Sequence, residues 1–147
     1  MGQAAELDAV IARMTADFLA QNTAAGMLRR ALDDVGVGFV PVMDHLTIRT
    51  MNIDQRAEEF VALGYGYDET IYYDDWYAKV FRKAGYPALF VDQAYPDARG
   101  HTSIIPRWVD KFGDRVFHHV AVRVEDIEQA ILKLKSTMDG LKPGERL

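Results

Sequence analysis

The stretch V-M-D-H-L-T-I-R-T at residues 42–50 decides the fold, because residues 116–124 repeat it as V-F-H-H-V-A-V-R-V. In both copies β-branched and apolar residues alternate with His, Thr and Arg, which is the pattern of a half-buried β-strand. His119 lies 74 residues after His45. That offset is longer than a solenoid repeat and suits a duplicated module of one strand, one helix and a few more strands.

Strand geometry predicts which side chains share a face, because successive side chains of a strand point to opposite sides. One predicted face carries four residues of each copy, namely Met43, His45, Thr47 and Arg49, then Phe117, His119, Ala121 and Arg123. The opposite face carries Asp44, Leu46 and Ile48 in the first copy and His118, Val120, Val122 and Val124 in the second. Each copy therefore presents a His and an Arg from one side, and His118 is expected to pack on the other side against a helix.

A capped helix is predicted after each copy of the strand. Asn52 and Asp126 are good N-cap residues, an acidic residue follows each in the first turn, and apolar residues then recur at helical spacing. After the first of these helices, short strands are predicted at about residues 70–73, 76–82 and 86–93. The predicted order is therefore β-α-β-β-β.

The predicted fold class is α+β: a βαβββ module with an N-terminal helical extension and an incomplete second module. The predicted divisions are the extension at 1–40 and the main domain at 41–147, which comprises a first module at 42–93, a long connection at 94–114 and a partial second module at 115–147. The second module is expected to stop after its helix. Residues 141–147 are too few for three more strands, which need roughly 25 residues at typical lengths.

Composition excludes several classes of function. The chain has 147 residues, 49 % of them hydrophobic, which is enough for one domain with a real core. Its net charge is −5 and no basic stripe is present, so nucleic acid is excluded as a partner. No apolar run approaches the roughly 20 residues of a membrane span, and no signal peptide is visible. With no cysteine there is no thiolate site, and the composition predicts a cytoplasmic protein.

His45 and His119 are the candidate metal ligands. If the two modules are related by a pseudo-twofold axis, these histidines converge, because each lies at the same point of its strand. Imidazole suits Fe(II), Zn, Ni and Mn, and two His plus a carboxylate with open positions is the arrangement of Fe(II) oxygenases. A single His on a strand is more often a surface or satisfied core residue, but two at the same point of a repeated motif favour ligands. A cation beside Arg49 would suit a 2-oxo acid, whose carboxylate the guanidinium would hold.

Three further residues are weighed as site candidates. Asp92, near the end of the fourth predicted strand, is the best-placed carboxylate ligand, and a surface aspartate at a strand end is an equal alternative. His101 lies in the long connection and is expected to be exposed, although its segment could fold over a site. His118 is expected only to pack. No glycine-rich phosphate loop or nucleophile elbow is present in the sequence.

The segments D-H-L-T-I-R at 44–49 and H-H-V-A-V-R-V-E-D-I at 118–127 resemble the first strands of the vicinal oxygen chelate superfamily, which includes glyoxalases and extradiol dioxygenases built from paired βαβββ modules. Within it, the helical extension and the His-x-x-x-Arg strand are similar to the 2-oxoadipate dioxygenase/decarboxylase family. The resemblance covers most of residues 20–140. It implies non-haem Fe(II) and O₂ chemistry that converts a 2-oxo acid to a 2-hydroxy acid with loss of CO₂.

The resemblance also implies roles for individual residues. His45 and His119 match the two His ligands, and Arg49 matches the Arg that binds the substrate carboxylate at the catalytic centre. Arg123, at the equivalent position of the second copy, is a second candidate substrate-binding residue. The third ligand of the family is a Glu on the last strand of the second module, which lies beyond the end of this sequence. Either the chain is a fragment, or another chain completes the site, or no full metal site exists.

Two functional hypotheses follow. The first is a dioxygenase/decarboxylase-like protein that uses Fe(II), or another divalent metal, on a small 2-oxo acid. The second is a glyoxalase-like binding or scaffold protein without metal or catalysis. The strand at 116–124 would leave an unpaired edge, which predicts a homodimer. The missing carboxylate predicts weak metal binding.

Overall fold

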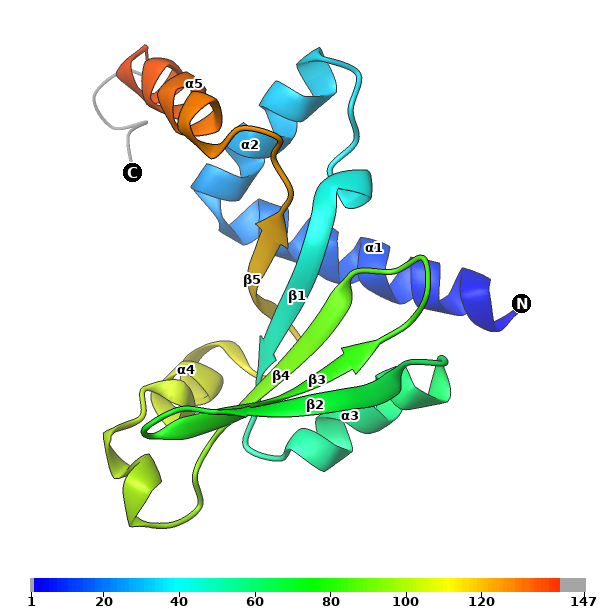
Figure 1. Cartoon of the computed structure of the whole chain (residues 1–147), viewed down its shortest axis with the longest axis vertical. Coiled ribbons are helices and arrows are strands. Elements are labelled where there is room, and N and C mark those ends of the chain that lie inside the picture. The colour runs from blue at the N-terminus through cyan, green and yellow to red at the C-terminus, as the bar shows by residue number, and fades with distance from the viewer. Residues whose placement is uncertain (1, 141–147) are drawn as a thin grey trace.

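The computed structural model describes residues 2–140 and has an α+β fold (Figure 1). The helices are α1 (Gln3–Gln21), α2 (Thr23–Asp34), α3 (Ile53–Ala62), α4 (Ile105–Phe112) and α5 (Ile127–Asp139), with short 3-10 helices η1 (Val40–Val42) and η2 (Ala98–Thr102). The strands are β1 (Met43–Arg49), β2 (Gly66–Tyr72), β3 (Trp76–Arg82), β4 (Ala88–Ala94) and β5 (Phe117–Val122). Residues 141–147, on which the expected end of the second module depends, lie outside the described residues.

One mixed sheet holds the fold together, with the strand order β2-β3-β4-β1-β5 (Figure 1). The elements β1-α3-β2-β3-β4 confirm the predicted β-α-β-β-β order, and β1 runs parallel to β4. The two copies of the repeated strand, β1 and β5, lie side by side and antiparallel. Two equivalent strands paired in this way are related by an approximate twofold axis between them.

The first copy of the repeated strand contains a β-bulge. The register of β1 against β5 shifts between Met43 and His45, so Asp44 is an extra residue in the ladder. Met43 consequently points into the core, where it is 6 % exposed, and the side chain of Asp44 bonds to His45. The prediction that Met43 shares the face of His45, with Asp44 on the other side, is therefore wrong, because strict alternation does not survive an inserted residue.

The second copy contains a bulge at the equivalent position. Thr47 pairs with His119, but the next residue of β1 pairs with Phe117, which leaves His118 as the extra residue. Phe117 is 4 % exposed in the core, and the imidazole of His118 contacts that of His119 instead of packing against the core. The predicted faces of Phe117 and His118 are therefore wrong for the same reason as those in the first copy.

The hydrophobic core lies on the face of the sheet that α1 and α3 cover. It joins one stripe from each helix to the inward side chains of β1, β3, β4 and β5, and its largest members include Leu7, Ile11, Leu46, Phe60 and Leu89. Helix α1 packs into this core, so the N-terminal extension is a packing element. Among the described residues no helix is both long and apolar enough to cross a membrane.

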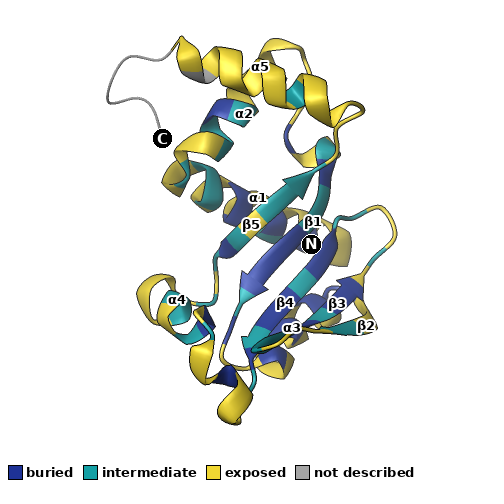
Figure 2. Cartoon of the chain, turned by 60° about the vertical axis from the view of Figure 1, so that its left-hand side comes forward, coloured by how far each residue is buried: buried dark blue, intermediate teal, exposed yellow. Residues whose placement is uncertain are grey.

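Helices α3 and α5 follow equivalent strands but are buried to very different extents. Both begin as predicted, because Asn52 accepts a hydrogen bond from Gln55 N at 3.1 Å and Asp126 accepts one from Gln129 N at 3.0 Å. Helix α3 buries Ile53, Ala57 and Phe60 against the sheet. The equivalent residues of α5 are Ile127, Ile131 and Leu134, which are 63 %, 45 % and 37 % exposed. Figure 2 shows α5 as an almost wholly exposed helix away from the buried sheet.

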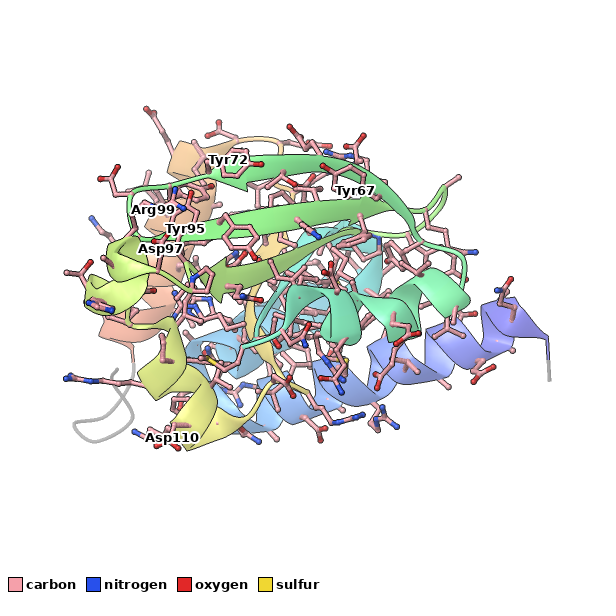
Figure 3. The ribbon with its side chains drawn as sticks, turned by 90° about the horizontal axis from the view of Figure 1, so that it is seen from below. Tyr67, Tyr72, Tyr95, Asp97, Arg99 and Asp110 are labelled. Atoms are coloured by element: carbon pink, nitrogen blue, oxygen red, sulfur yellow. The ribbon has the colours of Figure 1, made fainter. Side chains whose placement is uncertain are left out.

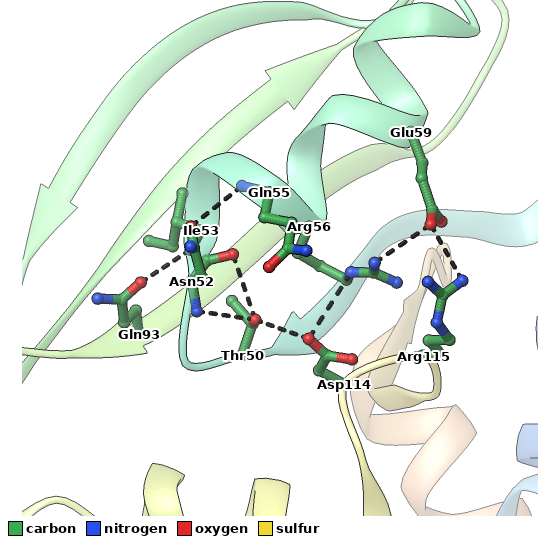
Figure 4. Close-up of polar contacts among 9 residues, drawn as sticks. All are labelled: Thr50, Asn52, Ile53, Gln55, Arg56, Glu59, Gln93, Asp114 and Arg115. Carbon is green, nitrogen blue, oxygen red and sulfur yellow. Dashed lines mark hydrogen bonds and ion pairs between the residues drawn. The ribbon is translucent and has the colours of Figure 1, made fainter.

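The long connection at 94–114 is anchored to the start of α3 by polar contacts (Figure 4). Thr50 Oγ1 donates to Asp114 Oδ2 at 3.0 Å, and Asp114 also lies 3.8 Å from the Nε of the buried Arg56. Arg56 and Arg115 both contact the carboxylate of Glu59, at 3.2 and 3.0 Å. These contacts fix the chain between α4 and β5, and so help to fix the position of the second repeated strand.

Candidate functional site

His45 and His119 meet at the centre of the β1–β5 ribbon. Their ring centroids are 5.5 Å apart, and the rings meet nearly edge-on at 81°. His45 also contacts Phe90 of β4, with ring centroids 4.8 Å apart, which places the pair on the sheet face opposite α1 and α3. The predicted convergence of the two histidines is confirmed, and it occurs within one chain. We call this sheet face the site face.

A neighbouring side chain orients each of the two imidazoles. Asp44 Oδ2 accepts from Nδ1 of His45 at 2.9 Å, and Nε2 of His45 makes no hydrogen bond to a described residue. Nδ1 of His119 lies 2.9 Å from Nδ1 of His118, and its Nε2 lies 2.8 Å from the hydroxyl of Thr47. The two bulges therefore have the same consequence, because each sets its extra residue against Nδ1 of the following histidine.

The surroundings of the second histidine keep it neutral. Partial loss of hydration lowers the pKa of His119, and the nearby His45 and Arg49 lower it further, although His119 retains exposed surface. Burial and the charge of Arg49 lower the pKa of His118 to about 4. In the first copy the bond from His45 and the ion pair with Arg123 lower the pKa of Asp44. A neutral imidazole at neutral pH is the form that binds metals.

Arg49 and Asp92 form a second, charged part of the site face. They are Cα partners in the β1–β4 ladder, and Asp92 is only 3 % exposed. Burial raises the pKa of Asp92 to about 7, against a smaller opposite effect of Arg49. The Nε atom of Arg49 is buried and has no hydrogen-bond partner. Of the two interpretations of Asp92, the surface aspartate is wrong, because the connection that follows β4 folds over this end of the strand.

Helix α4 covers this charged end of the site face. Trp108 lies over Arg49, with the guanidinium carbon 5.8 Å from the ring centroid, and it also contacts His118 edge-on with centroids 5.3 Å apart. Ile105, at the start of α4, is 2 % exposed. The long connection thus contains a helix of eight residues, and its Trp108 covers part of Arg49.

Arg123 lies away from Arg49, and His101 is exposed. Because β1 and β5 are antiparallel, Arg123 lies at the opposite end of the ribbon from Arg49, and its Nε donates to Asp44 Oδ1 at 2.8 Å. Its side chain is 76 % exposed, and its role in binding substrate stays a prediction. His101 is exposed on η2, as expected.

The segment around η2 is fixed by its own contacts. Figure 3 shows Arg99, Asp97 and Tyr95 together at the start of the long connection. Arg99 binds both carboxylate oxygens of Asp97 and lies over the ring of Tyr95, with its guanidinium carbon 3.8 Å from the centroid. The charge of Arg99 is thus paired with that of Asp97 within the loop that carries His101, so neither group is a free charge for the site face.

The two imidazoles fit two positions of a metal's coordination sphere, but they do not complete one. Nε2 of His45 is available with its Nδ1 held by a carboxylate, which is the usual second contact of a metal-binding histidine. Nε2 of His119 is available once the hydroxyl of Thr47 is displaced. No group of three or more His, Cys, Asp or Glu residues suited to a metal occurs in the described part of the chain. A further ligand would have to be water, substrate or a residue from elsewhere.

An apolar cavity of about 370 Å³ lies along the outer edge of β5. Met27, Phe39, Val120 and Leu134 line it, and it extends to His119. Met27 comes from α2 and Leu134 from α5, so both helices contribute to its walls. The cavity gives the histidine pair an apolar neighbour that the sequence did not reveal, because its walls come from α1, α2, β5 and α5, which are far apart in the chain.

Comparison with known proteins supports the fold and leaves the function open. No protein-family model matches the chain, and no curated protein matches it. A solved structure of a "putative hydrolase" from Shewanella frigidimarina is similar, with a TM-score of 0.72 and 17 % sequence identity. The similarity covers 88 % of this chain and 72 % of that one. At this identity it shows a shared fold alone, and membership of the vicinal oxygen chelate superfamily stays a prediction.

Sequence reasoning missed both bulges and the position of Trp108. A signal for the bulges is present: Asp44-His45 and His118-His119 each put two polar residues in succession where one would continue the alternation. Trp108 carries no such signal, because its contact with Arg49 joins segments almost 60 residues apart.

Proposed function

We propose that this chain binds a divalent metal, with Fe(II) as the first candidate, through His45 and His119, and a small 2-oxo acid through Arg49. The activity would be that of a dioxygenase/decarboxylase-like protein. The observation that carries the proposal is the meeting of two histidines from equivalent positions of a repeated strand, with ring centroids 5.5 Å apart. One ion could contact two imidazoles this close together, which supports the proposal.

The residues of the chain would then have distinct tasks. Asp44 fixes the ring of His45 with Nε2 directed away from the carboxylate, and His118 does the same for His119. Arg49 supplies a positive charge for the carboxylate of the ligand, beside the ring of Trp108 on α4. The metal, when bound, would supply Lewis-acid and O₂ chemistry.

A metal-free binding protein is the second candidate. The observation that favours it is that no group of three or more His, Cys, Asp or Glu residues suited to hold a metal occurs among the described residues. The chain would then hold a small acid by Arg49 and Trp108 and carry out no reaction. Both candidates predict binding of an acid, and they differ in whether metal is needed.

Metal titration of the purified full chain separates the two candidates. Calorimetry with Fe(II) under anaerobic conditions should show weak binding to the wild type, since two imidazoles leave most of the coordination sphere to water. His45→Ala and His119→Ala should each weaken it at least about tenfold, and the exposed His101→Ala is the matched control. Unchanged affinity in both site variants would refute the metal site.

Catalysis is tested by incubating the Fe(II)-loaded chain with small 2-oxo acids and measuring CO₂ release and O₂ consumption. The proposal predicts both, and it predicts their loss in Arg49→Gln with Fe(II) binding retained. Binding of the acids without turnover, and unaffected by metal removal, would favour the second candidate instead.

We also propose that the chain forms a homodimer in which a second copy covers the outer edge of β5. The described sheet ends at β5, and the adjacent α5 exposes Ile127, Ile131 and Leu132 at 63 %, 45 % and 58 %. A free strand edge beside apolar side chains tends to recruit a partner. Light scattering should show two chains per particle, and Ile131→Glu should give monomers. Val61→Glu, at an exposed valine of α3, is the control.

A further inference from the structure

Arg49 and Asp92 oppose each other on the site face without bonding. They are Cα partners on adjacent strands, yet they form neither a hydrogen bond nor an ion pair in the described structure, and Arg49 Nε has no partner at all. Asp92 is 97 % buried by residue surface, since only 3 % of it is exposed. A buried carboxylate and a buried guanidinium nitrogen that remain unpaired are costly. Such a pair suggests that both groups interact with a third group.

No other charged group on the surrounding elements compensates Asp92. On β3 its Cα partner is the buried Ala78, and on α4 the inward residues are Ile105 and Trp108. The charged residues of α4, namely Arg107, Asp110 and Lys111, are exposed. On η2, His101 is exposed and Arg99 is bound by Asp97. On β5, His118 is uncharged at neutral pH because its pKa is lowered to about 4. Arg49 is the one charge whose field acts on the Asp92 carboxyl in the described part of the chain.

We propose that a carboxylate ligand binds between Arg49 and Asp92, and that Asp92 takes up one proton from solvent as the ligand enters. The inference rests on the proposed role of Arg49 in binding a small 2-oxo acid and extends that site to Asp92. The guanidinium of Arg49 donates to the ligand carboxylate, and the protonated carboxyl of Asp92 donates its O–H to the same group. The proton taken from solvent is added to the ionised Asp92, and the ligand anion binds beside it. No bond of the ligand is broken.

The chemistry of the pair explains why a carboxylate is the suited ligand. Its two oxygens can accept from two donors at once, one charged and one neutral, and charge-assisted bonds to an ionised acceptor are the strong ones. A neutral ligand would leave Arg49 uncompensated, whereas a second negative charge beside an ionised Asp92 would be repelled. Proton uptake removes that repulsion, and because Asp92 titrates near neutrality the uptake takes place at physiological pH.

Fluorescence of Trp108, which lies 5.8 Å from the Arg49 guanidinium carbon, provides the assay. The variant Trp76→Phe leaves Trp108 as the single tryptophan, because the chain has two. We would titrate it with 2-oxobutanoate, metal-free in the presence of EDTA, at pH 6 and pH 8. The probe is ionised at both values, so a difference in affinity reports on the protein. The dissociation constant should be about tenfold larger at pH 8 than at pH 6.

Asp92→Asn, which resembles the protonated acid in shape and charge, should bind the probe at pH 8 as the parent does at pH 6. Calorimetry at pH 7.5 in buffers of different ionisation enthalpy should show net proton uptake in the parent and none in Asp92→Asn. The measurement of proton uptake by calorimetry needs only the parent protein, so it still tests the proposal if Asp92→Asn is unstable.

The outcomes separate this inference from the proposed function. pH-independent affinity, or binding without proton uptake, would overturn the role of Asp92 even where Fe(II) binds to the histidines. Proton-coupled binding that Arg49→Gln abolishes would support it, whether or not a metal binds. No saturable change in fluorescence at either pH would overturn both the carboxylate site and the role of Arg49.

Discussion

Ile53 and Ile127 give a matched test of the fold, because they are the same residue at equivalent positions of the repeat. Each is the first residue of the helix that follows a repeated strand. Ile53 is 2 % exposed and Ile127 is 63 % exposed. Substitution of each by Ala removes the same atoms from the same kind of position, so the difference in cost measures the difference in packing alone.

The expected magnitudes follow from burial. A buried Ile→Ala change costs about 2–5 kcal/mol, because it loses transfer free energy and leaves a cavity. Full burial of an Ile side chain is worth about 1.5–3 kcal/mol, and Ile127 buries roughly a third of its surface, so its loss costs about 0.5–1 kcal/mol. The better helix propensity of Ala offsets a few tenths of that, about 0.4 kcal/mol or less. We expect Ile53→Ala to be destabilising by about 2 kcal/mol or more beyond Ile127→Ala.

Urea unfolding followed by circular dichroism would measure both free energies. Thermal unfolding should show a drop of roughly 5–15 °C for Ile53→Ala, by the usual relation for a domain of this size, and almost none for Ile127→Ala. Repeating the measurement at several protein concentrations tests the proposed dimer, since an interface that covers α5 would make the cost of Ile127→Ala rise with concentration. Equal costs for the two variants at low concentration would refute the difference in packing.

Three further predictions concern the site. Thr47→Val should remove the hydroxyl 2.8 Å from Nε2 of His119 and destabilise the fold by about 0.5–1.5 kcal/mol, measured by urea unfolding. Gly100→Ala should cost about 1–3 kcal/mol in the same assay, because its Cβ would clash with the backbone carbonyl of Tyr95. Stability should fall as pH rises from about 4 to 7, in the part due to Asp92, since its folded pKa of about 7 exceeds the unfolded value. Comparing Asp92→Asn with the wild type across this range isolates that part, and parallel pH profiles would contradict it.

Much of the fold could be predicted because it depends on local patterns. The alternation in the repeated strand and the caps at Asn52 and Asp126 specify strands and helices through neighbours only a few residues away. The repeat itself adds one long-range fact, which is that equivalent residues meet when equivalent strands pair. The meeting of His45 with His119 follows from that symmetry, so it was predictable without knowledge of the remaining packing.

The side-chain faces near the histidines were not predictable from alternation. A bulge adds a residue to one strand of a pair, and whether it forms depends on the partner strand and on what the core accepts at that point. Here Met43 and Phe117 are buried in the core, and the residue after each, Asp44 or His118, has no partner in the β1–β5 pairing. The burial of Asp92 is likewise a tertiary effect, because it depends on the position of α4, and the chain that leaves α4 is held by contacts such as Thr50 with Asp114.

The two bulges also explain how one backbone motif serves two different electrostatic settings. Both copies place an extra residue against Nδ1 of the next histidine, but that residue is Asp44 in one and His118 in the other. The hydrogen bond from His45 and the contact with Arg123 lower the pKa of the Asp44 carboxyl, whereas partial burial, His45 and Arg49 lower the pKa of His119. Exchanging the two residues by Asp44→His with His118→Asp would set the carboxylate against His119 instead of His45. The geometry of the pair thus follows from the repeat, and its electrostatic surroundings depend on the residue beside each histidine, which is Asp44 in one copy and His118 in the other.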